Sequence, residues 1–114
     1  MRSKRSKNST RNTPNAAQKR WLDLVAGSGS IVDYAPCVIH HMWGATAQVK
    51  GVGNIGHWSL LPLTPYQHDL YHHDRTEFER RYGGQKELFL KLIRRFKDMP
   101  FEDDVLRAIL SYHR

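Results

Sequence analysis

The stretch HWSLLPLTPYQHDLYHH, residues 57–73, decides the fold of this chain because it changes from strand-like to helix-like within a few residues. Its first five residues predict a β-strand that ends at Pro62, since proline cannot donate a hydrogen bond to a sheet. Pro65 suits the first turn of a helix, whose body we expect to run from Tyr66 to about His73. The stretch therefore predicts a strand followed directly by a helix.

The segment before this stretch predicts a partner strand. Residues 31–43 mix apolar and polar side chains around His40 and His41, which favours a strand followed by a turn. Residues 44–56 contain four glycines and predict an irregular loop or the tip of a hairpin. The order strand, loop, strand, helix indicates an α+β fold with a small core made of a hairpin and a helix.

Additional helices are expected on both sides of this core. Thr13 and Pro14 are typical of an N-cap and a first helical position, and Gly27 is expected to end that helix. Apolar stripes predict three later helices, marked by Phe78 and Tyr82, by Leu88, Leu92 and Phe96, and by Val105, Leu106, Ile109 and Leu110. We expect residues 1–12 to be a disordered basic arm and residues 13–114 to form a single domain.

The positive charge of the chain is concentrated at its start. The net charge is +7, and the first 20 residues contain no Asp or Glu, whereas the remainder has 11 basic and 11 acidic residues. The basic residues of this arm are Arg2, Lys4, Arg5, Lys7, Arg11, Lys19 and Arg20. Such an arm is typical of binding to a polyanion, with nucleic acid ahead of anionic membrane. A solubilising tail or a transport signal is the alternative.

The sequence also indicates a compartment. No apolar run approaches the roughly 18 residues of a transmembrane helix, and no apolar segment follows the basic residues as in a secretory signal. The single cysteine, Cys37, excludes an internal disulfide and a zinc knuckle built from cysteine pairs. We expect a reducing intracellular compartment, the cytoplasm (of the host cell if the chain is viral), and no membrane partner. A monomer and a homodimer are both compatible with the sequence.

The histidines suggest a metal site. His68 and His72 are four residues apart, so a helix presents them on one face. His40 on the neighbouring strand can supply a third imidazole, and three imidazoles suit Zn²⁺ and tolerate other divalent ions. Neighbouring strand residues point to opposite sides, so His40 and His41 are expected to have different tasks. A pair with this spacing also arises by chance on surface helices.

Three further residues are candidates for chemistry beside that ion. His41 has an ordinary pKa near neutrality, so it can accept a proton from water, unless it is a buried histidine bonded to a backbone carbonyl. His57 could orient that base, bind phosphate, join the metal ligands, or have no chemical role. Arg75 could contact a phosphate or form a structural salt bridge. One metal ion and one histidine are chemically sufficient for phosphodiester hydrolysis.

Several motifs occur in an order that resembles a known family. The segments are PCVIHH at 36–41, HWSLLPL at 57–63, HDLYH at 68–72, and then Asp74-Arg75, Phe78-Glu79, Tyr82-Gly83 and Gln85-Lys86. Together they resemble the HNH (ββα-metal) nucleases, and more narrowly the small phage proteins related to the recombination enhancement function nuclease. The resemblance covers roughly residues 13–93.

The resemblance implies a role for each histidine of the motifs. His41 matches the general base, His40, His68 and His72 match the metal ligands, and His57 falls near a motif where many members have Asp or Asn. The implied activity is a metal-dependent DNA endonuclease that makes nicks or double-strand breaks in phage DNA recombination, repair or processing. The implied cofactor is one divalent ion, Mg²⁺ or Mn²⁺, with Zn²⁺ as a further option. The implied partners are DNA and a host strand-exchange recombinase.

The chain departs from the family at one place. Many members hold a structural zinc with two Cys-x-x-Cys pairs, and the matching positions here are Ser30, Asp33, Thr64 and Gln67. We therefore expect no structural zinc, and we expect these four side chains to bond to one another instead. Two other functions stay open: a non-catalytic DNA-binding module with a structural metal, and a small helical adaptor whose histidines bind no metal.

Overall fold

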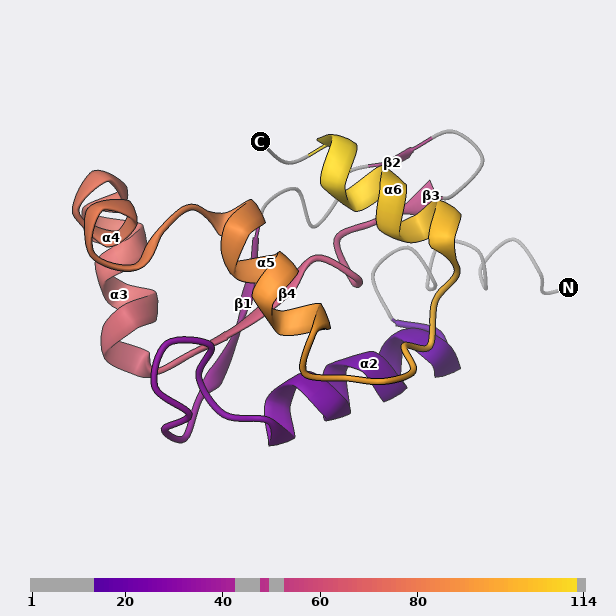
Figure 1. The fold of residues 1–114 in the computed structure, drawn as a ribbon, viewed down its shortest axis with the longest axis horizontal. Coiled ribbons are helices and arrows are strands. Elements are labelled where there is room, and N and C mark those ends of the chain that lie inside the picture. Colours follow the sequence, from indigo (N-terminus) through magenta and orange to yellow (C-terminus); the bar gives the residue numbers. More distant parts are fainter. Residues whose placement is uncertain (1–13, 43–47, 50–52, 113–114) are drawn as a thin grey trace, which may run out of the picture.

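The structure, a computed structural model, describes residues 14–42, 48–49 and 53–112 (Figure 1). In chain order its elements are α2 (Ala16–Gly27), β1 (Val38–His41), β2 (Gln48–Val49), β3 (Gly53–Asn54), β4 (Leu60–Leu63), α3 (Pro65–His73), α4 (Arg75–Tyr82), α5 (Gln85–Ile93) and α6 (Asp103–Tyr112). The predicted α+β class is confirmed. The predicted disordered arm, residues 1–12, lies outside the described residues.

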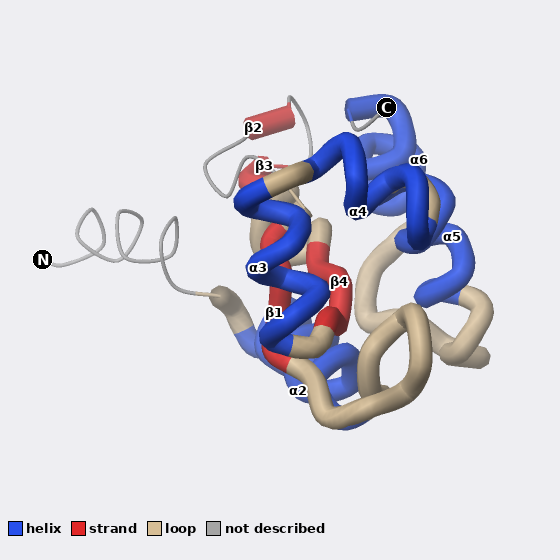
Figure 2. Tube along the Cα trace, turned by 90° about the vertical axis from the view of Figure 1, so that its left-hand side faces the viewer, coloured by secondary structure: helices blue, strands red, loops and turns tan. Residues whose placement is uncertain are grey.

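Two antiparallel strands and the helix that follows them form the centre of the fold. β1 pairs with β4, and the register places His40 opposite Leu61 and His41 opposite Leu60. α3 begins two residues after β4 and contacts both strands, with α2 and α5 packed around the same pair (Figure 2). This is the predicted unit of two strands and a helix. Between the two strands β2 pairs with β3, which agrees with the hairpin expected in residues 44–56.

The second strand begins later than predicted and contains Pro62. The carbonyl oxygen of Pro62 accepts a hydrogen bond of 2.8 Å from the backbone N–H of Ile31. In a strand the carbonyl and the nitrogen of one residue point to the same side, so both point away from β1 at Pro62. The missing N–H of this proline therefore removes no hydrogen bond between β1 and β4. His57 and Trp58, which we expected in the strand, lie in the turn before it.

The first strand and the first helix also differ from the prediction at their starts. Residues 31–33 form a turn, and only Val38–His41 are extended. The first helix is capped by Asn15, whose side chain accepts from the N–H of Gln18, whereas the predicted cap, Thr13, lies outside the described residues. Asparagine is as good a cap as threonine, and both precede the same apolar stripe.

The remaining helices follow the predicted pattern. α3 has Pro65 in its first turn, α4 ends at Tyr82 before two glycines, and α6 starts with Asp103 and Asp104 at its N-terminus. Phe96 is the exception, because α5 ends at Ile93. None of the helices in the described part of the chain is long and apolar enough to cross a bilayer.

A core of aromatic and aliphatic side chains fixes the two strands. All four residues of β4 are buried, and Trp21 of α2 is fully buried beneath them. The Trp21 indole N–H donates to the carbonyl oxygen of Trp58 at 2.9 Å, and the rings of Phe96 and Phe101 lie 5.3 and 5.1 Å from it. Burying each such side chain contributes about 1.5–3 kcal/mol. The strand that carries His40 is therefore held by the best-packed part of the molecule.

Candidate metal centre

The predicted ligands come together from one strand and one helix. His40 stands on β1 and is buried, whereas its neighbour His41 is exposed, as expected for adjacent residues of a strand. His68 and His72 lie one turn apart on α3. Thr64 and Gln67 cap the start of this helix reciprocally, which fixes the rotation of α3 relative to β4.

The three imidazoles form a compact group of nitrogen donors. One ring nitrogen from each of His40, His68 and His72 lies within 4.8 Å of the other two. The Nε2 atoms of His68 and His72 are 3.2 Å apart. Around a tetrahedral ion with bonds of about 2.0–2.1 Å, neighbouring ligand nitrogens are roughly 3.3 Å apart. The helix pair thus already has the spacing that one ion requires, with His40 positioned to complete the set.

Burial favours the neutral form of two of these ligands, His40 and His68. His40 is 2% exposed, and burial lowers its pKa to about 4 despite the hydrogen bond to Gln85. Burial and the neighbouring His72 also lower the pKa of His68. Only a neutral imidazole offers a lone pair to a metal. His40 and His68 are therefore able to bind a cation at neutral pH without first losing protons.

Two residues that we did not predict hold the ring of His40. Gln85, at the start of α5, presents its Oε1 atom 3.2 Å from His40 Nε2. An amide oxygen only accepts, so Nε2 carries the hydrogen and Nδ1 keeps its lone pair. Tyr71 packs against the same ring at 4.4 Å between centroids. Gln85 belongs to the segment that carried the family resemblance, but no spacing rule connects it with His40.

His41 and His57, the two residues predicted for catalysis, lie outside the group of three ligands. Partial burial, and next the charge of His57, lower the pKa of His41. The Nε2 atom of His57 is buried and has no hydrogen-bond partner among the described residues.

The basic residues predicted to contact DNA have different surroundings. Arg75 forms an ion pair with Glu79 at 3.0 Å and lies over the ring of Tyr71 at 5.4 Å, so the salt bridge that we had considered is present. Lys19 and Arg20 are exposed on α2. The other predicted contacts, Arg2, Lys4, Arg5, Lys7 and Arg11, lie outside the described residues.

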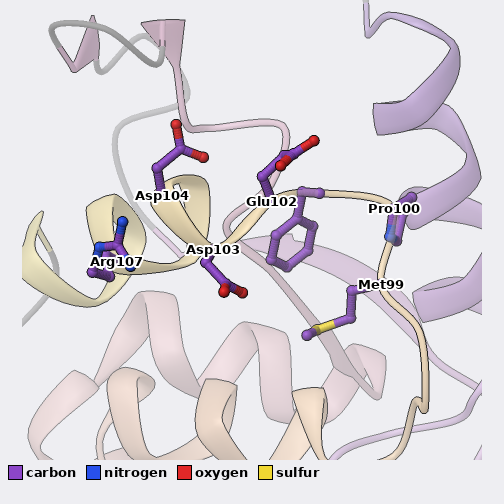
Figure 3. A pocket seen from close by; sticks show the side chains of 7 residues that line it. Met99, Pro100, Glu102, Asp103, Asp104 and Arg107 are labelled. Atoms are coloured by element: carbon purple, nitrogen blue, oxygen red, sulfur yellow. The ribbon is translucent and has the colours of Figure 1, made fainter.

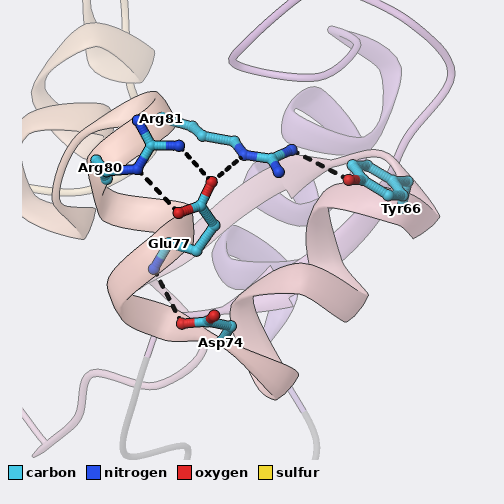
Figure 4. Close-up of polar contacts among 5 residues, drawn as sticks. All are labelled: Tyr66, Asp74, Glu77, Arg80 and Arg81. Carbon is cyan, nitrogen blue, oxygen red and sulfur yellow. Dashed lines mark hydrogen bonds and ion pairs between the residues drawn. The ribbon is translucent and has the colours of Figure 1, made fainter.

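The two arginines at the end of α4 share one carboxylate of their own helix. Glu77 accepts from both Arg80 and Arg81, which lowers the pKa of this carboxyl to about 2 (Figure 4). Arg81 also donates to the Tyr66 hydroxyl at 3.1 Å. This cluster links α4 to α3 and stabilises the helix pair that carries two of the histidines.

The four positions that lack cysteine form a hydrogen-bonded network. The Ser30 hydroxyl donates to Gln67 Oε1 at 2.6 Å, and Gln67 Nε2 donates to Asp33 Oδ2 at 3.2 Å. The N–H of Thr64 donates to the same Gln67 oxygen at 2.9 Å. The expectation that these side chains bond to one another is confirmed. The network joins the loop before β1 to the start of α3.

Because comparison with known proteins gives no match, the function of this chain is assigned from its own residues. Neither the family models nor the curated proteins nor the solved structures contain a match to this chain.

Proposed function

We propose that this protein is a metal-dependent DNA endonuclease of the HNH type that acts in phage DNA recombination, repair or processing. The cluster of His40, His68 and His72, built from a strand and the helix after it, is the observation that supports this most strongly. An ion bound by these imidazoles would stabilise the negative charge that develops on a phosphate during hydrolysis.

His41 is the proposed general base. Its neutral ring would take a proton from water, whose oxygen then bonds to phosphorus while the bond from phosphorus to the leaving oxygen breaks. The leaving oxygen finally takes up a proton from the solvent, and the protonated His41 returns its proton to the solvent. His57, whose charge lowers the pKa of His41, is proposed to orient this base. These roles go beyond the metal-binding cluster and depend on the experiment below.

The donor set narrows the choice of ion. The cluster consists of nitrogen atoms, and within the described residues no carboxylate joins it. Imidazole suits Zn²⁺ and other transition metals, whereas Mg²⁺ prefers oxygen ligands. We therefore propose Zn²⁺ as the working ion rather than Mg²⁺ or Mn²⁺.

The basic arm is proposed to attract the substrate. The first 20 residues, which include this arm and the start of α2, contain seven basic and no acidic residues. Contacts of this kind give affinity without sequence preference, and they weaken steeply as salt rises. A host strand-exchange recombinase stays a prediction of the resemblance alone.

A non-catalytic DNA-binding module is the second candidate. Its support is the position of the histidine cluster between β1 and α3, where an ion could serve only to lock the two elements together. It predicts that metal raises thermal stability while replacement of His41 has no consequence.

Nicking of supercoiled plasmid separates the two candidates. Wild type, His41→Ala, His72→Ala and the control His73→Ala would be compared with Mn²⁺, Zn²⁺ or Mg²⁺, and with EDTA. His73 is exposed beside His72, but its Nδ1 bonds to the Asp69 carbonyl, so it is a matched control. The endonuclease proposal predicts cleavage by wild type and His73→Ala only, abolished by EDTA. DNA binding without cleavage by any form would contradict it and favour the module.

A further inference from the structure

Tyr34, in the loop between α2 and β1, has an unusual backbone conformation. Its φ of 63° makes it the one non-glycine residue with positive φ in the described part of the chain. This left-handed region is uncommon for bulky residues, and such strain persists only where the surroundings enforce it. The side chain is nevertheless 70% exposed. A strained residue that displays an aromatic ring to solvent calls for an explanation other than core packing.

Arg95 holds this loop in place from the end of α5. Its guanidinium donates to the carbonyl oxygens of Ser28, Gly29 and Ser30 at 3.1, 2.8 and 2.7 Å. The same group lies 4.1 Å from the centre of the Tyr34 ring. Gly29 has a φ of +82°, and a Cβ there would lie 2.5 Å from the Tyr34 carbonyl oxygen. These contacts therefore hold the loop in one conformation, in which the ring of Tyr34 packs against the guanidinium of Arg95.

A basic hollow lies beside the ring. It has a volume of about 410 Å³ and is lined by Ile31, Val32, Tyr34, Lys91, Arg94 and Arg95. Lys91 and Arg94 are exposed, and neither forms an ion pair with another described residue. The hollow thus combines a flat aromatic surface with free positive charge.

Two other places on the described surface lack this combination. Tyr66 is also exposed, but the arginine beside it is paired with Glu77 (Figure 4). A hollow of about 580 Å³ at the start of α6 and the loop before it is lined by Glu102, Asp103 and Asp104 with Arg107, and its carboxylates would repel phosphate (Figure 3).

We propose that the hollow is a second nucleic-acid site, which stacks one unpaired base of single-stranded DNA on the ring of Tyr34. The neighbouring phosphates would bind Lys91 and Arg94. Stacking on aromatic rings beside cations is the general way in which single strands are bound without sequence preference. The choice of DNA as the polymer rests on the proposed function.

The position of the hollow defines a class of substrate. α5 connects the two sites, because Gln85 in its first turn contacts His40 and Lys91 and Arg94 lie at its other end. At about 1.5 Å per residue the separation along the helix is roughly 9–14 Å. With about 3.4 Å of helix axis per nucleotide in a stacked strand, this is on the order of three to four stacked nucleotides. The favoured substrate is DNA with an unpaired base a few nucleotides from the cleaved bond.

Fluorescence anisotropy with a labelled 20-nucleotide oligo(dT) and a 20-base-pair duplex tests this site. EDTA in the buffer prevents cleavage. Tyr34→Ala is expected to weaken binding of the single strand about five- to a hundredfold, the effect of losing one stacked base. Its effect on the duplex should be below about twofold, because paired bases do not reach the ring. Tyr34→Trp should restore binding, and the control Tyr66→Ala should bind like wild type.

The cations are tested by the double variant Lys91→Ala/Arg94→Ala. Two lost phosphate contacts should lower the slope of log Kd against log salt by about 1.4 for the single strand. Arg107→Ala, which removes one cation beside the acidic hollow, should leave the slope unchanged. Should Tyr34→Ala fail to fold by circular dichroism, Tyr34→Trp and the double variant still test the site.

Three results would overturn the proposal. The first is that folded Tyr34→Ala binds oligo(dT) with the same affinity as the wild type. The second is that Tyr34→Ala loses as much affinity for the duplex as for the single strand. The third is binding of oligo(U) at least tenfold tighter than oligo(dT), which would make RNA the ligand. Because binding is measured without metal, these results are independent of plasmid cleavage. If the protein binds single strands as expected but never cleaves DNA, that result contradicts only the proposed function.

Discussion

The side chains of Gln85 and His40 meet in the interior of the molecule, with Oε1 of the glutamine 3.2 Å from Nε2 of the histidine. Gln85 is the first residue of α5 and is only 4% exposed. The start of α5 thus sets the orientation of an imidazole that belongs to the metal-binding cluster. Partners of this kind, which do not touch the ion themselves, adjust how strongly a ligand binds it.

Replacement of Gln85 by leucine should weaken metal binding without removing a ligand. Losing the acceptor frees the His40 ring to rotate and to change tautomer, which typically reduces affinity about ten- to a hundredfold. Competition between the protein and a chromophoric zinc chelator would measure the change. Lys86→Ala, at the next position of the same helix, should bind zinc within about twofold of wild type. Equal affinities for Gln85→Leu and wild type would show that the contact has no influence on the site.

Acid should destabilise the metal-free protein through His40. Its pKa is about 4 in the folded chain and 6.5 in the unfolded chain, so the unfolded state binds more protons between these values. The free energy of unfolding should therefore have its full value above about pH 6.5 and fall by about 3 kcal/mol as the pH drops to about 4. Urea denaturation in EDTA across this range would measure it. His40→Gln should show a shallower dependence, whereas His73→Ala should keep the wild-type slope.

The network around Gln67 should contribute to stability in the absence of zinc. Gln67→Ala removes three side-chain hydrogen bonds and leaves the fully buried Ser30 hydroxyl without this acceptor. At about 1 kcal/mol for each bond, the free energy of unfolding should fall by roughly 2–4 kcal/mol. Asp33→Ala removes two bonds, from the Gln67 amide and the Ala35 N–H, but at an exposed carboxylate, so it should lower the free energy of unfolding by only about 1 kcal/mol. Equal unfolding midpoints in urea for the two variants would contradict this account.

The sequence predicts what depends on local spacing. His68 and His72 share a face because the helical period dictates it, and β1 separates His40 from His41 because strand residues alternate. The order of the elements and the glycine stops are local signals of the same kind. These features are sufficient to predict the three nitrogen donors, whereas the bonding among Ser30, Asp33, Thr64 and Gln67 is expected only from the family resemblance.

The features that the sequence does not predict depend on distant partners. Pro62 lies inside a strand because Ile31 satisfies its carbonyl from another segment. Gln85 and the strained conformation of Tyr34 are likewise determined by residues dozens of positions away, His40 and Arg95. No periodicity connects such pairs, so their contacts emerge only in the folded chain.

Titration of the metal-free protein with Co²⁺ tests the central claim most directly. A tetrahedral site absorbs visible light when cobalt binds, and this readout needs neither DNA nor catalysis. The account predicts one Co²⁺ per chain, displaced by Zn²⁺, with the signal lost in His72→Ala and retained in His73→Ala. An unchanged signal in His72→Ala, or no binding by the wild type, would contradict the assignment of His40, His68 and His72 as a metal site.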